Sequence, residues 1–381
     1  MTDRIAEFLR DSQGFVGQEA TDVPQGAEVA DWLTIRRFCA ALGDPNLLYK
    51  DPSSGVSTKY NSMIAPPTFV AAIRTPTAGA AYVQKNYGVT KITRQASMEW
   101  VDIIRVGDRL ISGLEVTGVG PGHPRNGRGT AHVESRATYR NSYGGLIGTA
   151  TGTSAMIPFR QGEEMISDRD IHEYSDEEIA NIEKGIEAEP PPRGKLLRYW
   201  DEVNLGEKLP QLVKGPLNLS DMMAWTVAEQ KTMPLGSPVY NDLKNMPGRT
   251  RTNPSTNWPF WDADQEFEDI LSCRDAGFSA PFSRGMHVVC LAGQVLTHWM
   301  GDDGFLRALD VDLPNHFLYG DTMWLSGEVT DKYKEKVGNE VYYAVAARLN
   351  GTNQLGETVA VGSAVVYLPS PGHPVALPIP H

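Results

Sequence analysis

The sequence predicts an α+β fold made of two similar halves, in each of which long antiparallel strands curl around one apolar helix. In the first half, the apolar pattern changes from a helical period to a period of two near Lys91. In the second half, the same order of helix and then strands returns. The turn at Gly107-Asp108 is repeated at Gly320-Asp321, 213 positions later (320 − 107), which is roughly one domain length.

Two helices are expected before the strands of the first half. Residues 32–42 have the apolar spacing of an amphipathic helix, and the turn-forming residues 43–46 end it. Residues 68–84 are small and apolar, which is typical of a helix covered on several sides. Pro76 must kink this helix or split it in two, because proline has no N–H to continue the helical hydrogen bonds.

Four strands are expected to follow in the first half. A hairpin turn at residues 141–145 separates the last two of them. Residues 118–127 are rich in glycine and predict a long loop between the second and third strands, without the glycine spacing of a phosphate-binding turn. The four predicted strands are residues 97–101, 110–119, 130–140 and 146–157.

Residues 161–197 predict a linker between the halves, because they are charged, contain a short helix signal near Ser175 and include three successive prolines. The chain therefore divides into residues 1–160 and residues 198–381. The second half contains the helices 221–230 and 286–300, and its strands repeat those of the first half. Residues 231–262 form an inserted loop, interpreted as a lid or specificity element or, alternatively, as a plain surface loop.

The composition indicates a soluble globular protein in the cytoplasm. Hydrophobic residues make up 41% of the chain, and its net charge of −12 disfavours nucleic acid and anionic membranes as partners. We expect no membrane span and no signal peptide. Cys39, Cys273 and Cys290 are expected to be reduced and packed in helices, so neither a disulfide framework nor a metal site is predicted.

The loop after the first amphipathic helix resembles a known motif. Residues 43–49 are similar to the hydratase motif of the MaoC-like acyl-CoA hydratases and dehydratases, Gly-Asp-x-Asn-Pro-(apolar)-His. Asp44 and Asn46 match it, Leu47 takes the proline position and Tyr49 takes the histidine position. The phrases that also resemble two-domain members of this family are residues 64–69, 105–110 and 296–307. The resemblance implies a double hot-dog fold, in which two antiparallel sheets each wrap around a central helix.

The resemblance also implies a chemistry, the reversible addition of water to a 2-enoyl-CoA. In such an enzyme an acid and a base flank the water, and an N–H at the start of a central helix stabilises the thioester oxygen. Asp44 is the expected base, Asn46 orients the loop or the water, and Tyr49 donates a proton where the family has histidine. Gly285, at the start of the second central helix, is the expected carbonyl donor. The other interpretation of the loop is that Asp44 and Asn46 only form a turn over a packed Tyr49.

Several residues are expected to bind substrate. Pro66 and Pro67 have no N–H, so the N–H of Thr68 is the nearest donor at the start of the first central helix. Guanidinium groups suit CoA phosphates. His316 is expected to begin a strand and to reach the mouth of the pocket, where it can contact the ligand. The residues predicted in these roles are Thr68, Arg249, Arg251, Arg284 and His316.

Weaker candidates complete the set. His287 and His298 are eleven positions apart (298 − 287), too far for one metal ion, and are expected in the core or at its rim. The carboxylates between residues 262 and 269 are expected on a solvated face, and one of them could serve as a base if the inserted loop folds inward.

The predicted function is hydration or dehydration of an acyl-CoA, with coenzyme A as part of the substrate and no other cofactor. A homodimer or larger hot-dog assembly is expected, or a complex with a partner hydratase. Two alternatives remain open because the family histidine is absent from both halves. The protein could be a catalytically silent acyl-CoA-binding subunit, or it could catalyse thioester hydrolysis or double-bond isomerisation.

Overall fold

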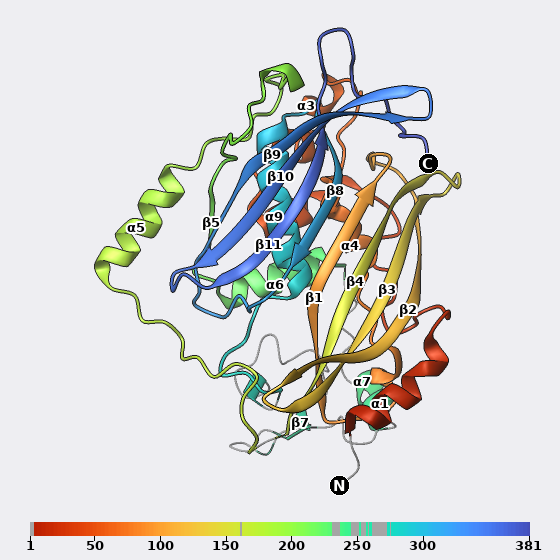
Figure 1. Ribbon diagram of the computed structural model, residues 1–381, viewed down its shortest axis with the longest axis vertical. Helices are drawn as coiled ribbons and strands as arrows, with labels where there is room; N and C mark the ends of the chain where they lie inside the picture. Colours follow the sequence, from red (N-terminus) through yellow and green to blue (C-terminus); the bar gives the residue numbers. More distant parts are fainter. Residues whose placement is uncertain are drawn as a thin grey trace.

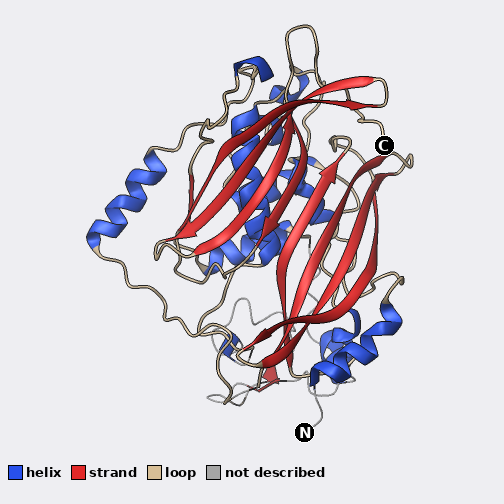
Figure 2. Ribbon diagram, in the orientation of Figure 1, coloured by secondary structure: helices blue, strands red, loops and turns tan. Residues whose placement is uncertain are grey.

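The computed structural model describes residues 4–160, 162–230, 237–244, 251–252, 257, 259–260, 273–274 and 276–381. Within this part of the chain, one antiparallel sheet runs through both halves, in the order β2-β3-β4-β1-β8-β11-β10-β9-β5 (Figure 2). Its strands are β1 (Val89–Trp100), β2 (Leu110–Arg125), β3 (Arg128–Asn141), β4 (Leu146–Pro158), β5 (Leu212–Lys214), β8 (Phe305–Asp312), β9 (Met323–Val337), β10 (Glu340–Asn353) and β11 (Thr358–Tyr367). A separate pair consists of β6 (Arg251–Thr252) and β7 (Pro259–Phe260).

The sheet has the same order when it is read inward from either half. From the first half the order is β2, β3, β4, β1, and from the second half, after the short edge strand β5, it is β9, β10, β11, β8. The two innermost strands, β1 and β8, pair with each other, with Gln95 opposite Asp312 and Glu99 opposite Ala308. The two predicted sheets are thus joined at their edges into one, and each half keeps the strands that the internal repeat predicted.

Helices and helical turns fill one face of the sheet and its edges. In Figure 1, α9 and α6 lie behind the strands of the second half, and α5 stands apart at the edge beside β5. The helices are α1 (Arg4–Ser12), α2 (Trp32–Leu42), α3 (Pro52–Val56), α4 (Val70–Ile73), α5 (Asp176–Glu187), α6 (Leu219–Ala228), α7 (Ser237–Lys244) and α9 (Gly285–Met300). The 3-10 turns are η1 (Gln13–Phe15), η2 (Leu47–Tyr49), η3 (Pro67–Phe69), η4 (Ala80–Val83) and η5 (Trp200–Glu202).

The second central helix forms as the apolar pattern predicts. Every residue of α9 from Met286 to Met300 is buried, which explains why the helix is apolar on all sides. The predicted helix 32–42 is α2. Asp31 caps it by accepting from the N–H groups of Leu33 and Thr34, and Gly43 ends it in the left-handed conformation with a φ of 61°.

The first central helix is much shorter than predicted. The segment 68–84 contains η3, the four-residue α4 and η4, with extended backbone between them. Arg74, which follows α4, has a φ of −165° and a ψ of 124°. Pro76 disfavours the helical conformation of the residue before it and cannot donate a helical hydrogen bond, so the helix ends there instead of bending.

Two other predictions about local structure were wrong. The glycine-rich segment 118–127 is not a long loop, because β2 continues to Arg125 and pairs with β3. Asn126 and Gly127, with φ values of 50° and 74°, form the short turn between these strands. His316 was expected to begin a strand, but it lies in the connection between β8 and β9.

The remaining features concern the linker and the thiols. The predicted helix near Ser175 is α5, and Ser175 and Glu178 form a capping box at its start. The three cysteines are buried and unpaired with one another. Among the described residues, no helix has the length and apolar character that a membrane crossing requires.

Candidate active site

The start of α9 supplies backbone N–H donors at the boundary between the halves. The first N–H groups of any helix have no partner within the helix, and the N-cap Arg284 makes no side-chain hydrogen bond to them. Gly285 is required here because the helix approaches β1 and the residue after β8 closely. A Cβ at this position would lie 2.7 Å from Thr93 Cβ and 2.8 Å from Leu313 Cδ1. Glycine therefore allows α9 to begin directly against the sheet.

A cavity of about 340 Å³ opens at this helix start, and we call it the α9 cavity. Both halves line it. The first half contributes parts of residues 22–26, 71–82 and 91–93, and the second half contributes parts of residues 229–230, 282–288 and 313–317. Three predicted site residues, Arg284, Gly285 and His316, are among the lining residues. The cavity is thus a shared site at the boundary between the halves.

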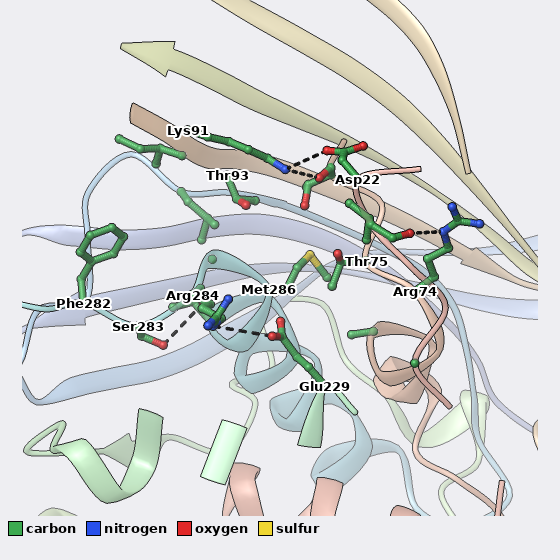
Figure 3. Close-up of a pocket in the computed structure, with 18 of the residues that line it drawn as sticks. Asp22, Arg74, Thr75, Lys91, Thr93, Glu229, Phe282, Ser283, Arg284 and Met286 are labelled. Atoms are coloured by element: carbon green, nitrogen blue, oxygen red, sulfur yellow. Dashed lines mark hydrogen bonds and ion pairs between the residues drawn. The ribbon is translucent and has the colours of Figure 1, made fainter. Parts of the chain in front are cut away.

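Two charged pairs lie on different walls of the α9 cavity (Figure 3). Next to the helix start, Arg284 Nε lies 3.7 Å from Glu229 Oε2, and their side chains are only 13% and 9% exposed. Glu229 is the C-cap residue of α6. On the other wall, Lys91 Nζ donates to Thr77 O at 2.7 Å and lies 3.8 Å from Asp22 Oδ2.

His316 presents a neutral imidazole to the α9 cavity. Its ring centroid lies 4.9 Å from that of Phe278 and 5.1 Å from that of Phe282. Burial, together with the positive charges of Arg94 and Arg125, lowers the pKa of His316 to about 3. The imidazole therefore stays uncharged at neutral pH.

Arg94 and Arg125 form a positive region beside this histidine. Arg94 Nη1 donates to Leu313 O (3.3 Å) and Pro314 O (3.2 Å). Arg125 Nη2 donates to Met165 O (2.9 Å) and Ile166 O (2.5 Å). The described residues provide no carboxylate in an ion pair with either guanidinium. Both positive charges are therefore balanced only by backbone carbonyl dipoles.

The predicted motif loop is buried and tightly bonded within itself. Asp44, which is 2% exposed, accepts through Oδ1 from the N–H of Asn46 at 2.9 Å. Asn46 in turn caps η2 by accepting from the N–H of Leu48 at 3.0 Å. Each side chain thus accepts a hydrogen bond from the backbone N–H two residues later, as aspartate and asparagine commonly do in turns.

Side chains of the second half also bind the end of α2 and this loop, and we call these contacts the clamp. Four successive residues of the first half take part, three through backbone carbonyls and one through its carboxylate. The atom pairs are His287 Nε2 with Ala41 O (3.2 Å), Lys214 Nζ with Leu42 O (2.8 Å), Gln294 Nε2 with Gly43 O (3.4 Å) and His298 Nε2 with Asp44 Oδ1 (3.2 Å). Donors at a helix C-terminus satisfy its unpaired carbonyls and suit the negative end of its dipole.

His287 illustrates how the clamp is held. Its ring stacks on Trp225, with centroids 4.7 Å apart and planes at 14°. Because Nε2 must donate to the carbonyl of Ala41, Nδ1 accepts from the hydroxyl of Ser283 at 2.8 Å. Burial lowers the pKa of His287 to about 4, although the Ala41 hydrogen bond opposes this shift. The expectation that His287 and His298 lie in the core is confirmed, since they are 3% and 4% exposed.

Tyr49 borders a second cavity, which measures only about 20 Å³ and which we call the small cavity. Pro66, Pro67 and Asp302 also line it. Burial raises the pKa of Tyr49 well above its ordinary value, and the charges of Asp44 and Asp302 raise it further. The phenol is therefore a weaker acid than a free tyrosine.

The structure does not bring Asp44, Asn46 and Tyr49 together with Gly285. Asp44 contacts His298, and Gly285 begins the same helix thirteen residues earlier (298 − 285). At about 1.5 Å per residue, the two positions are about 20 Å apart along α9. One water molecule cannot contact both Asp44 and the N–H of Gly285, so the catalytic roles of these residues remain separate predictions.

The other predicted binding residues lie elsewhere. Thr68 lines neither cavity; it packs on α9, where a Cβ at Gly293 would lie 2.6 Å from Thr68 Cγ2. Arg249 lies outside the described residues, as do the carboxylates predicted between 262 and 269. Arg251 begins β6, and only its backbone is described. In the described part of the chain, no three His, Cys, Asp or Glu side chains gather to form a metal site.

Glu229 is the residue that sequence reasoning missed. It ends α6 at nearly the place where Gly43 and Asp44 follow α2, and the internal repeat makes these two helices equivalent. No motif marks Glu229 in the sequence, because it is the C-cap of α6 whereas Asp44 follows the C-cap Gly43 of α2.

Comparisons with known proteins agree with this architecture. Residues 15–149 match the family model described as the FAS1-like dehydratase domain region. A UPF0336 protein of Streptomyces avermitilis is 37% identical over 79 residues, which are 20% of this chain and 53% of that protein. The match therefore spans about half the length of that curated relative.

Two solved structures resemble nearly the whole chain. A protein described as a MaoC-like dehydratase has a TM-score of 0.62 at 15% identity, covering 93% of this chain and 99% of the other. A putative MaoC domain protein dehydratase from Chloroflexus aurantiacus has a TM-score of 0.57 at 13% identity, covering 93% and 95%. At these identities the likeness concerns the fold. Residues 15–149 thus match a dehydratase family model, both halves resemble MaoC-like dehydratases in fold, and the chain has a double hot-dog fold.

Proposed function

We propose that the protein adds water to a 2-enoyl-CoA, or removes it from a 3-hydroxyacyl-CoA, with the thioester carbonyl at the start of α9. One observation carries this proposal: the α9 cavity of about 340 Å³ opens on the first turn of a buried 16-residue helix at Gly285. Ligand pockets commonly measure about 300–1,000 Å³, so the cavity is large enough for a small acyl thioester.

The helix start suits the charge that this reaction develops. Attack of water on C3 moves electrons through C2 onto the thioester oxygen, which becomes negative. Unpaired N–H groups and the positive end of the helix dipole stabilise such an oxyanion. Glycine at position 285 lets the helix begin against Thr93 of β1, and both residues line the cavity.

The CoA end requires positive charge, because the protein carries a net charge of −12 and CoA is itself an anion. We place its phosphates near Arg94 and Arg125. These guanidiniums flank His316 and use one nitrogen each in the contacts to backbone carbonyls. The remaining N–H donors have the geometry that binds phosphate oxygens well.

The size of the two cavities favours the α9 cavity as the place of reaction. If Asp44, Asn46 and Tyr49 supply the acid and base, the substrate has to reach the small cavity. That cavity, at about 20 Å³, has room for a water molecule, which needs about 10–15 Å³, and no room for an acyl chain.

Turnover tests the proposal directly. The purified protein is incubated with 2-enoyl-CoA and 3-hydroxyacyl-CoA esters of increasing chain length, and the enoyl thioester absorbance is followed. We expect conversion of at least one short ester. A protein that binds these esters and converts none of them would contradict the proposal.

A second candidate function is a silent acyl-CoA-binding subunit. It is favoured by the buried motif loop, in which Tyr49 replaces histidine and Asp44 contacts His298. It predicts tight binding of CoA esters without turnover, and increased activity when a separate hydratase is added. Release of free CoA, measured with a thiol reagent, would indicate thioester hydrolysis instead.

A further inference from the structure

The carboxylate beside the start of α9 belongs to Glu229. We propose that Glu229, and not Asp44, is the general base of the reaction. This inference rests on the proposed hydratase function and identifies the residue that activates water. It follows from where the two equivalent helices end, from what surrounds each carboxylate and from the size of the adjoining cavity.

The two halves each offer one carboxylate at the end of an equivalent helix. The helices α2 and α6 pack against each other, and each precedes the long strands of its half. After α2 the carboxylate is that of Asp44, and at the end of α6 it is that of Glu229. Of these two residues, only Glu229 lines the α9 cavity. Glu229, the C-cap of α6, thus stands close to the position that the motif aspartate has in the first half, where Asp44 directly follows the C-cap Gly43.

Glu229 is held next to the predicted oxyanion donor. Its carboxylate lies 3.7 Å from Arg284, the residue directly before Gly285. Figure 3 shows Glu229 and Arg284 reaching toward each other beside Met286. A thioester whose oxygen lies at the helix start therefore has its C2 and C3 atoms close to this carboxylate. Base and oxyanion donor then act on one substrate, as general base catalysis requires.

The other charged groups of the α9 cavity are less suited to this role. Asp22 accepts from the N–H of Gly79 at 2.6 Å and lies beside Lys91. Arg74 donates to Ala20 O and Val23 O, and as a guanidinium it cannot act as a base at neutral pH. His316 packs against the rings of Phe278 and Phe282, and its lowered pKa makes it a weak base. Arg284 supplies the charge that orients the Glu229 carboxylate.

The proposed steps balance without any other reactant. The Glu229 carboxylate takes a proton from water as the water oxygen bonds to C3. The electrons of the C2–C3 double bond form an enolate, whose oxygen is stabilised by the N–H groups at Gly285. Glu229 then returns the proton to C2, the enolate collapses to the thioester, and one water molecule has been added. Dehydration follows the same steps in reverse.

Asp44 has a different task in this scheme. Its carboxylate is bound by the N–H of Asn46 and by His298, within the clamp that joins the two halves. The carboxylate of the motif thus contributes to the contact between the halves, and the reactive carboxylate lies at the other helix end.

The variants Glu229→Gln and Glu229→Asp test the proposal, with kcat, KM and the pH profile as readouts. Loss of a general base costs about 10²–10⁴ in rate, so we expect kcat of Glu229→Gln to fall by that factor with KM changed little. In the wild type, kcat should fall at low pH because the base becomes protonated, and we call this part of the pH profile the acidic limb. The residual activity of Glu229→Gln should show no acidic limb. Glu229→Asp should restore part of kcat together with the acidic limb.

Two comparisons separate catalysis from structure. Glu99 also pairs with an arginine, Arg307 at 3.1 Å, but lies outside the α9 cavity, so Glu99→Gln is the matched control and should keep wild-type kinetics. If Glu229 served only as a partner for Arg284, then Arg284→Met would reproduce the whole effect and would also remove the acidic limb. Circular dichroism, thermal melting and binding of a saturated acyl-CoA show whether each variant is folded.

The outcomes distinguish this inference from the proposed function. An active wild type with Glu229→Gln within threefold of its kcat would overturn the role of Glu229 and leave the hydratase function standing. The same holds if Asp44→Asn, and not Glu229→Gln, removes the acidic limb. A wild type that converts no ester would overturn the proposed function and this inference with it.

Discussion

The two central helices of this protein begin in different ways, and the cavities beside them differ accordingly. In the first half, Pro66 and Pro67 precede a four-residue helix, and the cavity measures about 20 Å³. In the second half, Gly285 begins a 16-residue helix, and the cavity measures about 340 Å³. Proline has no N–H, and one helical turn carries little dipole, so the first helix start is a poor oxyanion site. The comparison favours the start of α9 as the place of the proposed binding site, while the motif loop lies in the first half.

The largest effect is expected from Gly285→Val. The Cβ of any side chain here would lie 2.7 Å from Thr93 Cβ, so the start of α9 must move away from the sheet. We expect kcat/KM to fall by about 10²-fold or more, because the oxyanion donors move with it, and stability to fall by about 1–3 kcal/mol. Gly129→Ala is the control, since a Cβ at Gly129 meets no atom within 4 Å. An active Gly285→Val protein would show that the first helix start is the reactive one.

The pH dependence of stability tests the clamp at His287. The pKa of this buried imidazole is about 4 in the folded protein and 6.5 when exposed, so the unfolded chain binds the proton more tightly. The contribution of His287 to stability is therefore complete above pH 6.5 and is lost as the pH falls from about 6.5 to about 4. This difference in pKa between the folded and unfolded protein amounts to about 3 kcal/mol.

Denaturant unfolding between pH 7.5 and pH 4.5 measures this loss. His287→Gln can still donate to Ala41 O but cannot titrate, so its stability should depend less steeply on pH. His316, whose pKa is lowered to about 3, contributes a remaining slope of the same sign. Equal slopes in the wild type and in His287→Gln would contradict the burial of a neutral imidazole at this position.

Asp44→Asn should affect stability more than chemistry. The variant weakens the contact with His298 inside the clamp, and leaving a buried polar group poorly paired costs about 1–3 kcal/mol. We expect the free energy of unfolding to fall by this amount while kcat stays within about threefold. A loss of kcat without a loss of stability would instead support Asp44 as the catalytic base, as the motif predicts.

The smallest effect is expected from the positive region beside the α9 cavity. Arg125→Gln should raise KM for a CoA ester about three- to tenfold with kcat unchanged, because it removes an attraction that acts equally on substrate and transition state. The effect should shrink in high salt. Arg140, which is exposed and donates to Gly144 O, provides the control Arg140→Gln. An unchanged KM in Arg125→Gln would place the CoA phosphates elsewhere.

Local structure could be predicted where the signals lie close together in the sequence. Asp31 caps the start of α2 and the left-handed Gly43 ends it, and the run of apolar residues marks the extent of α9. Prediction failed where the outcome depended on distant partners. The glycine-rich residues 118–127 form a strand because β3 is available to pair with them. The small apolar residues after Thr68 predicted a long helix, but beside Pro76 only the four residues of α4 are α-helical.

The candidate site was predictable only in part. The residue types at Arg284, Gly285 and His316 suggested ligand contacts, and the three share one cavity. Glu229 carried no motif, and its position beside Arg284 depends on how α6 packs near the start of α9. The motif residue Asp44 looked reactive in isolation, but its surroundings come from His298, 254 positions away.

The sequence by itself determined the internal repeat, the helix-then-strands order of each half and the resemblance to the MaoC-like dehydratases. Periodicity and caps act over a few residues, and a motif can be read without knowing its neighbours. The tertiary structure alone decided which carboxylate faces the cavity and which one joins the halves. Burial, cavity size and hydrogen-bond partners are set by residues hundreds of positions apart, which meet only when β1 and β8 pair and close the two halves together.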